Sequence, residues 1–192
     1  DLLFKYHAAC YGVHSPVECA KRIAKNPAFD AKKVEKVEVR HAARLKGMCD
    51  QQKPKTGLEI KFSLYMTTAM ALAGLDTGSL DVYTSEMAQK EELVELRNKV
   101  ILIAEETFTP NQSEVIVYQT DGTIMRETDD LATPNRDLNG QWEKLTSKFR
   151  TLAIPLVGNE NAEATIASIL DLENQKSLLS VISPITGASV NS

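Results

Sequence analysis

A short stretch near the amino end combines a cation, two imidazoles and a thiol. These side chains belong to Lys5, His7, Cys10 and His14, and the stretch leads into a predicted helix that starts with a capping box, Ser15-Pro16-Val17-Glu18. The amino end of a helix offers unpaired N–H donors and the positive end of the dipole, which suits a carboxylate. Two interpretations stay open: an anion-binding site, or a well-packed strand-to-helix turn with ordinary polar groups.

A second polar stripe lies on an otherwise apolar helix that we predict over residues 58–73. Lys61, Tyr65 and Thr68 stand at positions i, i+4 and i+7, so on one continuous helix they share a face. A buried ammonium must find a partner or reach solvent, and a carboxylate substrate in a cleft would be such a partner. Alternatively, the Lys61 stem extends outward and the stripe merely touches water.

Other kinds of chemistry lack sequence support. There is no P-loop, dinucleotide-binding glycine pattern, HExxH motif or nucleophile elbow, and three scattered histidines predict no zinc site. The net charge of -4 comes from interspersed acidic and basic residues, so no nucleic-acid partner is expected. Three cysteines without a CxxC motif predict reduced thiols and a cytoplasmic protein, and no apolar run is long enough for a membrane span.

Periodicity and turn signals predict the elements that position these residues. Asp121-Gly122 between two β-rich runs predicts a hairpin, and a second capping box, Thr56 with Glu59, begins the apolar helix that Gly74 ends. Strands are expected at 2–6, 33–41, 100–105, 114–120 and 123–127, and helices at 15–26, 58–73, 84–99 (one or two), 141–152, 160–171 and 174–182. The predicted class is α+β: an antiparallel sheet with helices covering one face.

The chain begins with Asp1 inside an apolar run, Leu2-Leu3-Phe4, and not with Met. We therefore expect that another segment precedes it.

Three segments resemble the MmgE/PrpD family, which includes 2-methylcitrate dehydratase, cis-aconitate decarboxylase and iminodisuccinate epimerase. The stretch from Lys53 to Tyr65 is similar to the family pattern "KP-x-TGLE-x-KFSL", and the stretch from Gln141 to Arg150 is similar to "W-x-x-L-x-x-KFR". The residues from Lys5 to His14 agree in order and spacing with the segment before the family's first lid helix. The resemblance covers nearly the whole chain.

This resemblance implies a two-domain enzyme without a metal or organic cofactor. Residues 1–156 would be its α+β lid domain, and residues 157–192 would be C-terminal helices that pack on a missing N-terminal all-helical domain. The active site would lie in a cleft between the domains, and the enzyme would be a homodimer acting on a small polycarboxylate.

The resemblance also assigns roles to residues of this chain. Lys5 matches the active-site lysine of the family and would bind a substrate carboxylate, while Tyr65 matches an active-site tyrosine that donates a hydrogen bond or relays a proton. His14 matches a positioning histidine, and we add Cys10 and Lys61 to the substrate-binding set. Cys10 stands where the decarboxylase branch has a catalytic histidine, so the chain departs from that branch.

The expected activity is that of a 2-methylcitrate dehydratase-like hydro-lyase, with remaining acid and base groups on the missing domain. Epimerisation and decarboxylation are the alternatives within the family. A non-catalytic α+β module whose apolar surfaces serve assembly is the alternative outside it. The enzyme interpretation requires Lys5 and Tyr65 to face a shared crevice.

Overall fold

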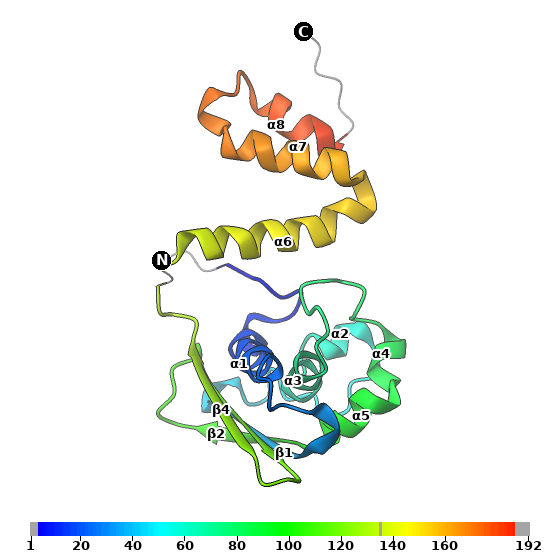
Figure 1. Ribbon diagram of the computed structural model, residues 1–192, viewed down its shortest axis with the longest axis vertical. Helices are drawn as coiled ribbons and strands as arrows, with labels where there is room; N and C mark the ends of the chain where they lie inside the picture. The colour runs from blue at the N-terminus through cyan, green and yellow to red at the C-terminus, as the bar shows by residue number, and fades with distance from the viewer. Residues whose placement is uncertain (1–3, 135, 187–192) are drawn as a thin grey trace. The chain divides into compact units, whose positions relative to one another are not determined.

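The computed structural model describes residues 4–134 and 136–186. Contacts divide the chain into two compact units, Asp1–Pro134 and Asn135–Ser192. The first unit holds the β-sheet and helices α1–α5, and the second holds helices α6–α8 (Figure 1). The boundary expected after residue 156 concerns packing on a further domain, and it stays a prediction.

One four-stranded sheet forms in the order β2-β1-β3-β4. The strands are β1 (Val34–Ala42), β2 (Val100–Glu105), β3 (Gln112–Gln119) and β4 (Ile124–Asp130). β3 pairs antiparallel with both β1 and β4, but β1 and β2 run parallel. The α+β class is confirmed, whereas the prediction of a purely antiparallel sheet is wrong. The helical segment between β1 and β2 carries the chain back to the same end of the sheet, as a parallel pair requires.

Helices cover one face of this sheet (Figure 1). α1 (His14–Ala24) packs against α3 (Leu64–Leu72) and contacts β3 and β4. On β1, the fully buried Val37 and Val39 belong to the apolar core. Arg40, the next residue, belongs to the opposite face of the strand and pairs with carboxylates on β2 and β3. This alternation is what a strand with one covered face produces.

The apolar helix predicted over residues 58–73 is interrupted. It consists of α2 (Gly57–Ile60) and α3, because the Ser63 side chain accepts a hydrogen bond from Met66 N and caps a new helix. Leu64 N donates to Cys49 O at 2.8 Å, which fixes the break against the preceding loop. The Thr56–Glu59 capping box is confirmed. The prediction of a single helix is wrong, so Lys61 precedes α3 and does not share a helix face with Tyr65.

The amino end of α1 also differs from the prediction. A 3₁₀ turn, Tyr11–Val13, leads directly into α1 at His14, and no side chain caps the helix. Ser15 is buried, and its hydroxyl lies 2.5 Å from the Ser113 hydroxyl on β3. The capping-box prediction at Ser15 is therefore wrong, because a tertiary contact uses the hydroxyl that would have capped the helix.

The remaining elements of the first unit follow their sequence signals. Gly122 has φ +85° in the β3–β4 turn, and the predicted helical stretch before β2 forms α4 (Ser85–Gln89) and α5 (Glu91–Asn98). Gly74 has φ +77° after α3, as expected of a helix-ending glycine. Residues 4–6 have no regular structure, so the described part of the strand predicted at 2–6 is not formed; residues 1–3 lie outside the described range.

The described residues of the second unit form three α-helices. They are α6 (Leu138–Val157), α7 (Asn159–Leu170) and α8 (Leu178–Thr186), with α7 packed against both others. Arg150 on α6 holds both carboxylate oxygens of Glu163 on α7, at 2.6 and 2.8 Å. None of the described helices is long and apolar enough to span a membrane.

Candidate functional site

Residues 4–10, here called the strap, lie across the first unit without regular secondary structure. Backbone hydrogen bonds join the strap to segments at both ends of α3. Ala8 N donates to Thr77 O at 3.0 Å in the loop after α3, and Cys10 N donates to Lys61 O at 2.9 Å just before it. Most of the reactive side chains singled out near the amino end therefore sit on a segment that tertiary contacts hold.

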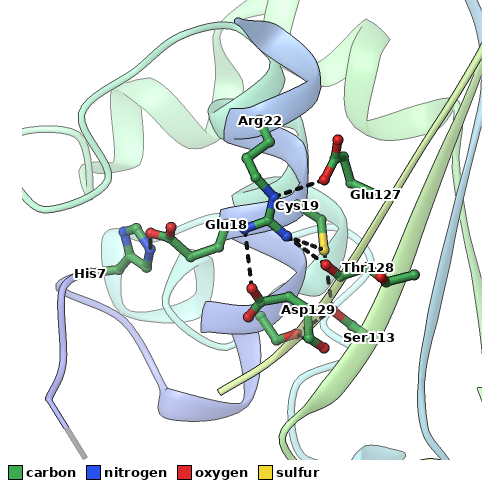
Figure 2. Close-up of polar contacts among 9 residues, drawn as sticks. His7, Glu18, Cys19, Arg22, Ser113, Glu127, Thr128 and Asp129 are labelled. Atoms are coloured by element: carbon green, nitrogen blue, oxygen red, sulfur yellow. Dashed lines mark hydrogen bonds and ion pairs between the residues drawn. The ribbon is translucent and has the colours of Figure 1, made fainter. Parts of the chain in front are cut away.

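His7 is the buried polar side chain of the strap, with only 1% of its surface exposed. Its Nε2 lies 2.9 Å from Glu18 Oε1 on α1, and its Nδ1 lies 2.8 Å from Thr77 Oγ1 (Figure 2 shows the Glu18 contact). Tyr83 OH donates to Thr77 O at 2.8 Å and so fixes Thr77. The sequence analysis placed His7 in a possible anion-binding stretch and Glu18 in a capping box, but it did not pair them, because residues 7, 18 and 77 share no local pattern.

His14 lies beside this cluster, at the first position of α1. Its ring centroid is 4.8 Å from that of His7 and 5.0 Å from that of Tyr11, and the side chain is buried. His14 therefore lies next to the strap residue His7, with its imidazole packed between two other rings. Its proposed part in substrate positioning stays a prediction.

Cys10 and Lys61 come together through the backbone hydrogen bond described above. The Lys61 ammonium lies 5.3 Å from the centroid of the Tyr83 ring, a cation–π arrangement. Burial, and then hydrogen bonding with the Cys10 thiol, raises the pKa of the neighbouring Cys49 to about 12. Cys10 is only partly buried, so of these two thiols it is the one within reach of solvent.

Lys5 and Tyr65 differ in exposure: Lys5 is exposed on the strap, while Tyr65 is partly buried on α3. Burial, together with the negative charge of Asp50, raises the pKa of the Tyr65 phenol. Tyr65 therefore carries its proton at neutral pH and is suited to donate a hydrogen bond. The crevice shared by Lys5 and Tyr65 stays a prediction.

A hollow of about 420 Å³ is lined by residues that are near Lys61 and Tyr65 in the sequence. Asp50, the residue whose charge acts on Tyr65, lines it, and so does Phe62, which follows Lys61. The other lining residues are Gly47, Met48, Gln51, Leu58 and Glu59. Its two carboxylates make this hollow unsuited to a polyanionic substrate, so we do not place the substrate there.

A second polar cluster on α1 ties this helix to the sheet. Arg22 Nε donates to Glu127 at 2.8 Å, and its two terminal nitrogens reach Asp129 Oδ1 and Thr128 O (Figure 2). Burial opposes the charge of the guanidinium, but the hydrogen bond to Glu127 prevails and raises the pKa of Arg22. These three acceptors all lie on β4, so the cluster fixes the orientation of α1 against the sheet.

Metal ligation was not predicted. Within residues 4–134 and 136–186, no group of three or more His, Cys, Asp or Glu side chains is arranged to hold a metal ion.

Comparison with known proteins identifies a family. The sequence model of the MmgE/PrpD C-terminal domain matches residues 7–174, whereas no curated protein matches the chain. The match includes Cys10, His14, Lys61 and Tyr65, while Lys5 lies two residues before it. Because the match spans most of the 192 residues, the chain belongs to the MmgE/PrpD family, as its C-terminal domain.

Proposed function

We propose that this chain is the lid part of a cofactor-independent lyase that acts on a small polycarboxylic acid, in the manner of a 2-methylcitrate dehydratase. The family match over residues 7–174 is the observation that carries this proposal. In the same proposal, an N-terminal helical domain supplies the remaining acid and base groups, and the enzyme is a cytoplasmic homodimer.

Dehydration of such an acid removes a proton from a carbon next to a carboxylate, and the hydroxyl group on the adjacent carbon leaves as water while a double bond forms between the two carbons. Negative charge develops on that carboxylate as the proton is removed, and cations or N–H and O–H donors placed beforehand stabilise it. Lys5 is proposed to bind a carboxylate, with Lys61, whose carbonyl accepts from Cys10 N of the strap, as a second cation. Tyr65 is suited to the donor role because its raised pKa keeps the phenol protonated.

The strap supports this assignment because it carries Lys5 and Cys10 and is hydrogen-bonded to the Lys61 carbonyl. Its hydrogen bonds to Thr77 and Lys61 restrict where Lys5 can lie. A carboxylate ligand would thus meet cations whose backbone is already ordered, which lowers the entropic cost of binding.

The test incubates the protein, together with its helical domain, with a panel of hydroxylated, methylated and imino polycarboxylic acids and follows the products by NMR. Tyr65→Phe should lower kcat by roughly 10²-fold, the usual effect of deleting one donor to developing negative charge. Tyr118→Phe is the matched control, since Tyr118 lies on β3 under the Lys36 ammonium and outside the candidate site.

Two results would count against the proposal. One is the absence of turnover with every acid of the panel, which favours the alternative of a non-catalytic assembly module. The other is equal activity of the Tyr65→Phe and Tyr118→Phe variants. We further expect the 192-residue chain alone to show no turnover, and detectable activity would contradict the placement of acid and base groups on another domain.

A further inference from the structure

The strap carries Lys5 but has no helix or strand of its own to fix it. A segment of this kind is ordered only by the contacts that its few residues make, and the entropy lost on ordering must be offset by them. Two backbone hydrogen bonds, from Ala8 and Cys10, hold its carboxyl half. Between these bonds and Lys5 lies one deeply buried polar side chain, His7.

The two ring nitrogens of His7 contact different parts of the fold. Nε2 meets Glu18 on α1 at 2.9 Å, and Nδ1 meets the Thr77 hydroxyl after α3 at 2.8 Å. In the neutral ring, Nε2–H donates to the carboxylate and Nδ1 accepts from the hydroxyl. In the imidazolium, both N–H groups donate, because a hydroxyl also accepts. The contacts therefore survive in either protonation state.

Thr77 holds the strap twice. Its hydroxyl contacts His7, and its carbonyl accepts from Ala8 N and also from Tyr83 OH. Glu18 is only 14% exposed at its side chain, so water can replace its hydrogen bond with the imidazole only in part. His7, Glu18 and Thr77 thus form a clamp that spans strap, α1 and the loop after α3.

We propose that the His7–Glu18–Thr77 clamp positions the substrate-binding strap. His7 is then a positioning residue for Lys5, which precedes His7 by two residues. This inference rests on the proposed function, because it assigns the clamp to the placement of a carboxylate-binding cation. His7 is too deeply buried to touch substrate, and it acts through the backbone of the strap.

Kinetics of variants in the protein with its helical domain test the clamp. Thr77→Val deletes the hydroxyl but keeps shape and the backbone carbonyl, and it should raise KM by about 10-fold with a smaller change in kcat, as lost ground-state binding does. Glu18→Gln keeps an acceptor for Nε2–H and should stay within about threefold of the wild type, whereas Glu18→Ala should resemble Thr77→Val. His7→Ala should be at least as severe.

The control is Ile23→Val, a mild core change on the same helix at a residue that is 2% exposed and outside the clamp. It should lower stability by an amount comparable to the loss of one hydrogen bond and leave KM unchanged. An equal rise of KM in Ile23→Val, or an unchanged KM in both Thr77→Val and Glu18→Ala, overturns the positioning role.

Amide hydrogen exchange supplies a readout that does not require activity. The Ala8 and Cys10 amides should exchange about 10-fold faster in Thr77→Val and His7→Ala than in the wild type or Ile23→Val, because they open with the strap. Unchanged exchange overturns the clamp itself. If the wild type turns over no polycarboxylate, the proposed function fails and the catalytic role of the clamp fails with it, while faster exchange would still establish the clamp as a structural device.

Discussion

The three thiols show how strongly the surroundings of a residue decide its chemistry. Cys19 and Cys49 are fully buried, and burial is the largest cause that raises the pKa of each to about 12. Cys10 sits on the strap and is only partly buried. Because the thiolate is the reactive form, the same side chain is expected to differ in reactivity between these positions.

Alkylation by iodoacetamide should therefore label one cysteine first. At pH 8, a thiol with a pKa of about 12 is ionised in about one molecule in ten thousand, and a buried sulfur is also shielded from the reagent. We expect Cys10 to react in the native protein, and Cys19 and Cys49 to react only after denaturation. Peptide mass spectrometry identifies the labelled residue, and early labelling of Cys19 or Cys49 would contradict the burial described here.

At the scale of elements, the break between α2 and α3 is what brings Lys61 to the strap. On a continuous helix, Lys61 O would accept a hydrogen bond from Tyr65 N, four residues on. The break frees this carbonyl for Cys10 N. Ser63 maintains the break, since its hydroxyl accepts from Met66 N and donates to Gln51 O.

Replacing Ser63 by Ala should consequently destabilise the protein by about 2 kcal/mol, since the buried cap that accepts from Met66 N and the hydroxyl that donates to Gln51 O are both lost. Thr84→Ala removes an exposed cap of the same kind from α4 and should cost about 1 kcal/mol. Urea denaturation of both variants gives the comparison. Equal losses would show that the burial of Ser63 adds nothing to the cap.

The β3–β4 hairpin carries a pH-dependent contribution. Hydrogen bonds from Thr123, followed by the contact with the Lys33 ammonium at 3.0 Å, lower the pKa of Asp121 to about 2. A lowered folded-state pKa means that the stabilisation is fully present above the unfolded-state pKa of about 4 and is lost as the pH falls through 2. The urea midpoint of the wild type should exceed that of Asp121→Asn at pH 5, and this difference should shrink at pH 2.5. A difference that does not change with pH would contradict the assignment to Asp121.

For the whole molecule, the two units differ in how their apolar residues are used. The hydrophobic core cluster comprises residues between Ala9 and Met125, all in the first unit. In the second unit, large apolar side chains such as Leu156 and Leu178 remain 84% and 73% exposed. The first unit thus contains a complete core of its own.

A chain that ends at Pro134 should therefore fold cooperatively. We expect a single urea transition by near-ultraviolet circular dichroism and by fluorescence, because no residue of the core cluster is removed. Val37→Asp in the same shortened chain is the control, since it places a charge in that core and should abolish the transition. Loss of cooperativity in the shortened chain without this substitution would show that the second unit is needed for folding.

Signals that act within a few residues were sufficient for much of the fold and for the family. Asp121-Gly122 predicted the hairpin, and Thr56 with Glu59 predicted the start of α2, because the interactions that stabilise these features close within four or five residues. The family patterns quoted from the sequence led to the same family as the match over residues 7–174.

Only the tertiary structure decided the contacts between segments that are distant in the chain. It paired β1 with β2 in parallel, and it placed the Ser15 hydroxyl of α1 against Ser113 on β3. It also divided the apolar helix at the point where Leu64 N donates to Cys49 O. The His7 clamp belongs to the same group, since its partners lie 11 and 70 residues away. No periodic pattern records such contacts, because they depend on where the whole backbone places each donor and acceptor.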